Sequence, residues 1–171
     1  MTVTVRPMTL QETAEIIEYF HVATPEHLEM LGVDPSRLPP ASQWQRLYEQ
    51  MFDQPVEQRS SLLVSWLYED RFLGFSTADK IRIGQQANMH LHITDASQRK
   101  LGIGAECVRQ TVELYFQALK LKQLFCEPNA FNMAPNRTLQ KVGFKYVKTH
   151  MTVLGPLNFH QPVNRWVIDR G

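Results

Sequence analysis

The sequence predicts a mixed α/β fold of the α+β kind, in which helices flank a largely antiparallel sheet. The chain has 171 residues, of which 43% are hydrophobic and 20% are charged, as in a globular protein with a sizeable core. Alternating and helical apolar periods follow one another along the chain. No internal repeat, low-complexity tract or linker interrupts them, so we expect residues 1–171 to form a single domain.

The chain is expected to begin with a strand and a helix. Val3 and Val5 alternate with polar residues and predict a short strand within Thr2–Thr9. Along Leu10–Phe20, apolar residues recur at the spacing of one helical face.

Two further helices are expected before residue 60. Thr24 can cap the first, with Pro25 at its first position and its end near Gly32. Ser42 is expected to cap the second, which has one apolar face and ends before Pro55. These helices could line a pocket or simply cover one face of the sheet, and we assign no role to the histidines in this region.

Three runs of strand-forming residues follow, joined by two short polar turns. Short turns connect antiparallel neighbours, so the runs predict a meander. The runs are Leu62–Tyr68, Phe72–Ala78 and Asn88–Thr94.

The rest of the chain is expected to alternate helices and strands. Residues 103–119 place apolar side chains on one face and predict a helix that faces the core. Gly143 is expected to end a later helix, because glycine readily adopts the left-handed backbone of helix ends. The expected elements are a helix at Ile103–Leu119, a strand at Leu124–Glu127, a helix from about Ala134 to Gly143, and strands at Phe144–Leu154 and Val163–Asp169.

Charge and targeting signals limit the function. The formal net charge is +1 and the basic residues are scattered, which does not favour a nucleic-acid-binding surface. We find no secretory signal and no apolar run long enough to span a bilayer, so we expect a cytoplasmic protein without a membrane partner. Cys107 and Cys126 lack metal-site spacing and lie in apolar segments, which predicts free, buried thiols and no metal.

A basic, glycine-containing segment, Arg99–Ala105, stands between an expected strand and an expected helix. The first amides of a helix lack backbone partners and lie at the positive end of its dipole, so this arrangement can bind phosphate. Gly102 and Gly104 would let the backbone approach the anion closely. Glycines serve equally well in a plain strand-to-helix turn, so the segment alone leaves both interpretations open.

Two segments together resemble the GCN5-related N-acetyltransferase (GNAT) superfamily. The pattern Arg99-x-x-Gly102-x-Gly104 is similar to the acyl-coenzyme A signature of that superfamily. The segment Asn132–Phe144 is similar to a helix of the branch that includes ribosomal-protein N-terminal acetyltransferases. The order of the expected elements also resembles the family. The resemblance implies the GNAT fold, whose sheet splays apart at the acyl-coenzyme A site.

The resemblance also implies acetyl-coenzyme A as the acyl-donor substrate. Backbone amides would hold its pyrophosphate, and Arg99 would add a charge-assisted contact. The pantetheine arm would pair like an added strand with the end of the preceding strand. Asn132 would hydrogen-bond the pantetheine, cap its own helix, or do both. The implied coenzyme-binding residues are Ile93, Thr94, Arg99, Lys100, Leu101, Gly102, Ile103, Gly104, Ala105 and Asn132.

Acyl transfer to an amine favours a base, because the acceptor must lose a proton before it attacks the thioester. His90 and His92 stand two apart on one expected strand, so their side chains share a face. They could act as bases near neutral pH or simply pack within the sheet. Glu127 could orient the amine or relay a proton, or it could be a solvated strand end. Positioning alone could also supply much of the rate.

Two departures from the family leave the general acid unassigned. Leu139 stands where many members have a tyrosine, and Pro135 stands where the resembled branch often has a serine. Neither side chain can donate a proton. Tyr146 and Tyr68 remain as candidate donors, with core packing as their alternative role.

The motifs therefore predict an acetyl-coenzyme A-dependent N-acetyltransferase, whose acceptor is a primary amine of a small molecule or of a protein N-terminus. The alternative is a non-catalytic acyl-coenzyme A-binding or sensor module of the same fold. A Rossmann-type nucleotide site is set aside, because no third glycine follows Gly102 and Gly104. The tail at Gly155–Trp166 could contact the acceptor or form an ordinary hairpin connection. The sequence leaves the acceptor open, and it is compatible with a monomer or a homodimer.

Overall fold

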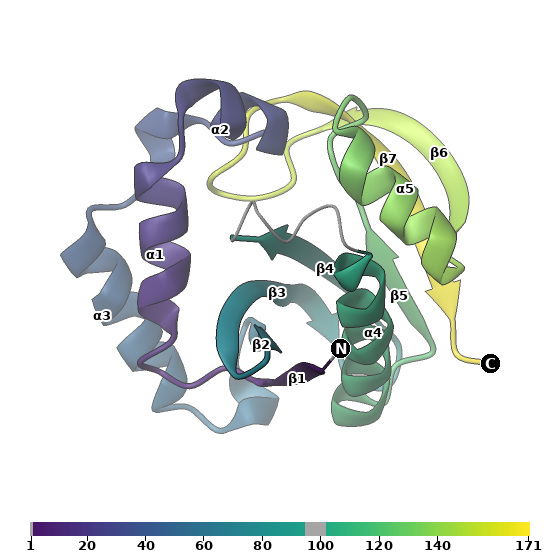
Figure 1. Cartoon of the computed structure of the whole chain (residues 1–171), viewed down its shortest axis with the longest axis horizontal. Helices are drawn as coiled ribbons and strands as arrows, with labels where there is room; N and C mark the ends of the chain where they lie inside the picture. The colour runs from purple at the N-terminus through teal and green to yellow at the C-terminus, as the bar shows by residue number, and fades with distance from the viewer. Residues whose placement is uncertain (1, 95–101) are drawn as a thin grey trace.

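The computed structural model describes residues 2–94 and 102–171, and these residues form a seven-stranded sheet flanked by helices (Figure 1). This architecture confirms the predicted α/β fold. The strands are β1 (Val3–Pro7), β2 (Leu62–Tyr68), β3 (Arg71–Arg82), β4 (Gln86–Ile93), β5 (Gln123–Cys126), β6 (Lys145–Thr152) and β7 (Gln161–Asp169). The helices are α1 (Thr13–Val22), α2 (Pro25–Leu31), α3 (Ala41–Phe52), α4 (Ile103–Leu119) and α5 (Met133–Val142).

The sheet has the strand order β1-β2-β3-β4-β5-β7-β6 and is antiparallel except between β4 and β5. The predicted meander is β2, β3 and β4. The parallel pairing of β4 with β5 ends at Met89 and Cys126, whereas β4 continues to pair with β3 as far as Ile93. Residues 90–93 therefore line the open side of a split in the sheet, as the resemblance implied.

The two faces of the sheet carry separate hydrophobic cores. One core lies against α4 and includes Trp66 and Tyr115. The other lies against α1, α2 and α3 and includes Phe75 and Trp44. Figure 1 shows these two groups of helices on opposite sides of the strands. None of the helices in the described residues has both the length and the hydropathy needed to cross a membrane.

Some helix ends follow their sequence signals and others do not. The Thr24 hydroxyl accepts a hydrogen bond from the His27 amide at 3.1 Å, and Gly32 ends α2 with φ of 75°, as predicted. The prediction that Ser42 caps α3 is wrong, because Pro40 occupies the cap position and no side chain bonds the first amides. The extended backbone of Pro40 (ψ of 144°) leads into the helix directly, so Ser42 falls within the first turn.

Several other boundaries differ from the prediction, among them those of α1 and β3. Helix α1 begins at Thr13 rather than at Leu10, because the preceding residues form a turn. Strand β3 continues past Ala78, because Asp79 still pairs with β4. The two cysteines are free and buried, as predicted, and burial with the nearby Glu106 carboxylate raises the pKa of the Cys107 thiol to about 12.

Glu12 joins the start of α1 to the sheet. Its carboxylate accepts hydrogen bonds from both terminal nitrogens of Arg6 at 2.7 and 3.0 Å, and from the Ser65 hydroxyl at 3.0 Å. The Thr9 amide donates to it as well, at 3.0 Å. Partial burial would raise the pKa of Glu12, but these donors prevail and lower it from 4.5 to about 2.

Replacing Glu12 with glutamine should make stability less dependent on pH. The folded-state pKa is lowered, so the carboxylate stabilises the fold above pH 4.5 and loses that effect as the pH falls toward 2. We expect Glu12→Gln to lower the free energy of unfolding by about 1–3 kcal/mol at pH 7 and by much less at pH 3. Urea unfolding at both values measures the difference, with Glu57→Gln, at an exposed position, as the control. A loss that is equal at pH 7 and pH 3 would contradict the assignment.

Candidate active site

Two cavities meet at the open end of β4. The first has a volume of about 510 Å³ and is lined by the end of β4, the start of α4, and residues of α2 and α5. The second has a volume of about 460 Å³ and is lined by β3, β4, α1, α3 and the loop between β6 and β7. Five of the described residues line both cavities: Leu31, Leu91, His92, Asn132 and Pro135.

The start of α4 lines the first cavity with little side-chain bulk. Gly102 has φ of 72°, a conformation that favours glycine, and no side chain caps the first amides of the helix. A Cβ atom on Gly104 would come within 3.2 Å of the Ile93 side chain, so glycine also suits this close approach. The end of β4 and the N-terminal turn of α4 therefore meet at a surface suited to an anion.

The predicted coenzyme-binding residues divide into three groups. Those that line the first cavity are Ile93, Gly102, Gly104, Ala105 and Asn132. Two lie nearby outside the lining: Ile103 is fully buried in the core, and Thr94 hydrogen-bonds to the Leu73 carbonyl through its amide and its hydroxyl. Arg99, Lys100 and Leu101 lie outside the described residues.

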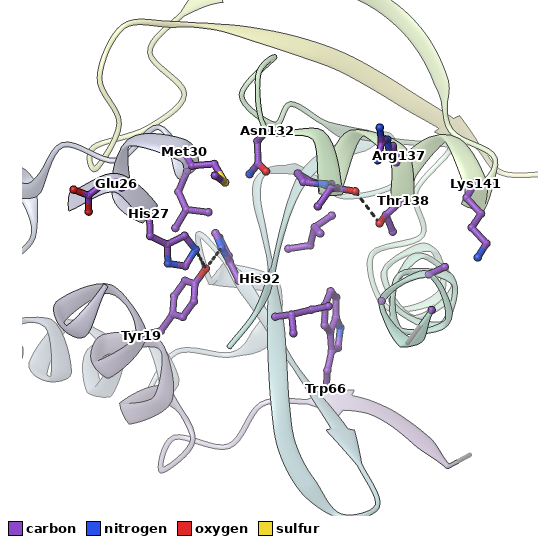
Figure 2. Close-up of a pocket in the computed structure, with 18 residues that line it drawn as sticks. Tyr19, Glu26, His27, Met30, Trp66, His92, Asn132, Arg137, Thr138 and Lys141 are labelled. Atoms are coloured by element: carbon purple, nitrogen blue, oxygen red, sulfur yellow. Dashed lines mark hydrogen bonds between the residues drawn. The ribbon is translucent and has the colours of Figure 1, made fainter. Parts of the chain in front are cut away.

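Asn132 stands at the cap position of α5 without acting as its side-chain cap. The predicted capping role is therefore wrong, because the Asn132 side chain makes no hydrogen bond to the first amides of α5. The Asn132 backbone carbonyl accepts a hydrogen bond from the Asn136 side chain at 2.7 Å. Asn132 instead lines both cavities, and Figure 2 shows its side chain beside the first. An amide at this place can donate and accept a hydrogen bond.

Basic residues of α5 complete the first cavity. Arg137 and Lys141 lie one turn apart on this helix, with Thr138 beside them, and all three line the cavity (Figure 2). Both cations are exposed. The sequence analysis did not assign them a role, although their spacing of four residues was the signal for a shared face.

A line of three hydrogen-bonding side chains lies where the cavities meet. The Tyr19 hydroxyl is 3.3 Å from His92 Nδ1 and 3.3 Å from His27 Nε2 (Figure 2). The His92 ring also stacks on Phe75, with centroids 4.9 Å apart. The sequence analysis missed Tyr19 and His27, because neither residue stands in a motif and Tyr19 is 73 positions from His92.

His90 lies on the same strand face as His92 but has different partners. Both histidines line the second cavity, as the spacing of two residues predicted. His90 Nε2 is 3.1 Å from Oδ2 of Asp79, a residue that also lines the cavity. The other oxygen, Oδ1, is buried and makes no hydrogen bond within the described part of the chain.

Glu127 is buried and contacts several polar side chains. The alternative that it is a solvated strand end is therefore wrong. Its side chain is only 4% exposed, yet it lines the second cavity. It accepts a hydrogen bond from Asn88 at 3.0 Å, and its oxygens lie 2.6 Å from His150 Nε2 and 3.2 Å from Arg165 Nη1. A buried carboxylate requires such partners, so Glu127 is held rigidly.

The structure places the two candidate tyrosine donors away from the cavities. The Tyr146 side chain is exposed and its hydroxyl bonds to Thr149, while Tyr68 packs against the core. Neither lines either cavity. Leu139, at the position where many family members have a tyrosine, is fully buried. The described part of α5 therefore brings no hydroxyl other than that of Thr138 to the cavities.

The connection between β6 and β7 forms a wall of the second cavity through residues 154–158. The Gly32 carbonyl, at the end of α2, accepts hydrogen bonds from the Asn158 and Gln161 side chains at 3.0 and 2.9 Å. Figure 1 shows this connection reaching across to α2. Part of the tail thus borders the cavity, while Trp166 belongs to the core of the sheet.

Comparisons with known proteins agree with this geometry. A family model described as the acetyltransferase (GNAT) domain matches residues 2–145. No match was found among curated protein sequences.

Solved structures share the fold at low sequence identity. AAC(6')-Ib, in complex with ribostamycin and coenzyme A, is 21% identical, with 99% of this chain and 94% of that chain covered and a TM-score of 0.76. RimL, a ribosomal L7/L12 alpha-N-protein acetyltransferase in complex with coenzyme A, is 13% identical, with 99% and 94% covered and a TM-score of 0.77. The microcin C7 self-immunity acetyltransferase MccE, in complex with acetyl-CoA and AMP, is 14% identical, with 98% and 92% covered and a TM-score of 0.77.

These identities establish the fold alone, whereas the family model spans most of the chain. The chain therefore belongs to the GNAT family of acetyl-coenzyme A-dependent N-acetyltransferases.

Proposed function

We propose that this enzyme transfers the acetyl group of acetyl-coenzyme A to the primary amine of a small molecule by direct attack of the amine on the thioester. The observation that carries this proposal is the meeting of two cavities at His92, one suited to each substrate. The second cavity is about 460 Å³ and is walled by a loop hydrogen-bonded to α2, which favours a compact acceptor over a protein N-terminus.

The first cavity would hold the coenzyme. The amides at the start of α4, with the predicted contribution of Arg99–Leu101, would bind the pyrophosphate, and Arg137 and Lys141 supply positive charge beside it. The pantetheine arm would pair with the end of β4 at Ile93, which lines the first cavity. Asn132 would hydrogen-bond that arm, which directs the thioester toward His92.

His92 would take the proton that the ammonium of the acceptor must lose. The free amine then attacks the carbonyl carbon, a nitrogen–carbon bond forms, and the carbon–sulfur bond breaks with its electron pair moving to sulfur. Tyr19 would donate its proton to the departing thiolate, and the adjacent histidines would return a proton to the phenol. The nitrogen loses its second proton to solvent as the carbon–sulfur bond breaks, so the products are an acetylated amine, free coenzyme A and one proton released to solvent.

His90 and Glu127 would act on the acceptor side. His90, paired with Asp79, borders the space through which the amine reaches His92. Glu127 is already engaged by Arg165 and His150, so we propose that it fixes the wall of the acceptor cavity and orients the amine through that wall.

Thiol release from acetyl-coenzyme A in the presence of a panel of amines tests the proposed function. We expect turnover with small primary amines and slower turnover with peptides that carry a free N-terminus. Coenzyme binding without turnover across a broad panel would instead support the alternative, a sensor module. Turnover that is confined to peptides would overturn the small-molecule acceptor.

The coenzyme site predicts an ionic contribution from α5. We expect Arg137→Ala combined with Lys141→Ala to weaken coenzyme A binding about tenfold or more at low salt, because two cations near the phosphates are lost. Calorimetric titration at two salt concentrations measures the effect, which should shrink at high salt. Lys148→Ala, at an exposed position outside both cavities, is the matched control. Unchanged affinity in the double variant would place the phosphates elsewhere.

Removing the base should slow chemistry without releasing the coenzyme. We expect His92→Gln to lower kcat about 100-fold, the usual scale of general base catalysis, with the Kd for coenzyme A unchanged. Steady-state thiol release and calorimetry measure the two quantities. His160→Gln changes an exposed histidine and should behave like the wild type. A His92→Gln enzyme with wild-type kcat would show that water or another group takes the proton.

The proton donor is tested by Tyr19→Phe, which keeps the ring and removes the hydroxyl. We expect kcat to fall about tenfold to 100-fold with the Kd for coenzyme A unchanged, because the thiolate then departs without its proton donor. Calorimetry of coenzyme A binding separates this result from a packing defect at the meeting of the cavities, which would weaken binding as well. Tyr146→Phe, remote from both cavities, is the control.

A further inference from the structure

Aromatic rings dominate one side of the second cavity. Phe20 stacks on Trp44 with centroids 5.7 Å apart and an interplanar angle of 26°, and Trp44 stacks on Tyr48 at 6.3 Å and 24°. Phe75, from β3, faces the same cavity. These rings pack on one another and are largely buried, and the parts of them that line the cavity make this side apolar and aromatic.

This aromatic side of the cavity, the ring wall, consists of Phe20, Trp44, Tyr48 and Phe75 and carries no charge near neutral pH. Burial raises the pKa of Tyr48 to about 12, so its phenol stays protonated. Leu63 and Met89 extend the apolar lining toward the sheet. A hydroxyl-rich ligand would leave its polar groups without hydrogen-bond partners against such a surface.

The acidic residues of the cavity differ in how fully they are paired. Glu127 has Arg165 and His150 as partners. Asp79 has neither lysine nor arginine within ion-pair distance in the described part of the chain, and its Oδ1 atom is buried without a hydrogen bond. The cavity thus offers one carboxylate whose charge a cationic ligand could balance.

That carboxylate is placed to favour a cation near the reacting centre. Asp79 contacts His90, which is two residues from His92 on one strand face, a spacing of about 7 Å. A single ammonium in the cavity would feel this negative charge while lying within reach of His92. A second or third ammonium would meet the carboxylate of Glu127, which is already balanced, in a cavity that the cationic side chain of Arg37 also lines.

We propose that the acceptor is a monocationic primary amine on an apolar, ring-bearing body, with the body packed against the cavity-lining parts of Phe20, Trp44 and Phe75. This inference rests on the proposed function and narrows it. It separates this enzyme from acceptors that are polycationic or rich in hydroxyl groups, although the aminoglycoside acetyltransferase shares the fold. A volume of about 460 Å³ accommodates a small molecule of this kind.

Competing amines test the proposal by turnover. We expect kcat/KM for 2-phenylethylamine or tryptamine to exceed that for kanamycin, spermidine and an N-terminal peptide by tenfold or more. A preference for any of the last three would overturn the acceptor class while the proposed acetyl transfer stands. Absence of turnover with every amine would count against the proposed function, and the acceptor class would then be decided by binding.

Binding measurements test the same inference without chemistry. In the presence of coenzyme A, 2-phenylethylamine should bind more tightly than 2-phenylethanol, its neutral counterpart, and Asp79→Asn should reduce that difference at least threefold. Equal binding of the amine and the alcohol by the wild type, or no binding of either, would overturn the proposal. So would an Asp79→Asn variant that keeps the full preference.

The ring wall is tested at Trp44. We expect Trp44→Ala to raise the Kd for 2-phenylethylamine tenfold or more and to leave coenzyme A binding unchanged. Trp44 is also part of the core, so Trp44→Leu provides a variant that keeps apolar volume but removes the flat ring. Phe131→Ala, at a side chain that is 80% exposed and lines neither cavity, is the matched control. Wild-type affinity in a folded Trp44 variant would overturn the placement of the ring-bearing body.

Discussion

The end of the parallel pairing between β4 and β5 is the constraint on which the rest of the site depends. The last pair is Met89 with Cys126, and two residues later Pro128 lacks the backbone N–H that a continuing ladder would need. Strand β4 therefore continues its pairing with β3, and the face that carries His90 and His92 opens between the diverging strands. The two cavities lie where the pairing of β4 with β5 has ended.

Glu127 holds the diverging elements in place. It stands directly after β5 and gathers Asn88 of β4, His150 of β6 and Arg165 of β7 around one buried carboxylate. Arg165 also lies over the Phe125 ring at 3.9 Å, which ties the cation to β5. Loss of a single partner would leave a buried charge uncompensated, so this junction makes the geometry of the split rigid.

Capping residues, helix-ending glycines and apolar periods predicted the helices whose bounds depend on neighbouring residues in the sequence. Thr24 and Pro25 at one end and Gly32 at the other were sufficient for α2, and the apolar period of residues 103–119 gave the exact bounds of α4. The contacts of Tyr19 with His92 and the burial of Glu127 join residues far apart in the chain, which no period or motif encodes. The proposed coenzyme side was therefore recognisable from motifs, while the proposed acceptor side, which α1 and α3 line, needed the structure.

Contacts between residues far apart in the chain also explain how the site can lack the tyrosine and serine hydroxyl groups expected on α5. Leu139 is buried in the core and Pro135 lies where the cavities meet, so neither of these two positions supplies a proton donor there. Tyr19 reaches that meeting point from α1, on the opposite side of the split, and lies between two histidines that could restore its proton. Moving the donor to α1 would couple it to the acceptor wall, because Tyr19 and Phe20 are adjacent and their rings pack edge to face at 5.1 Å. A ligand that displaces Phe20 would then also disturb the Tyr19 hydroxyl. The fit of the acceptor and the delivery of the proton would therefore depend on each other.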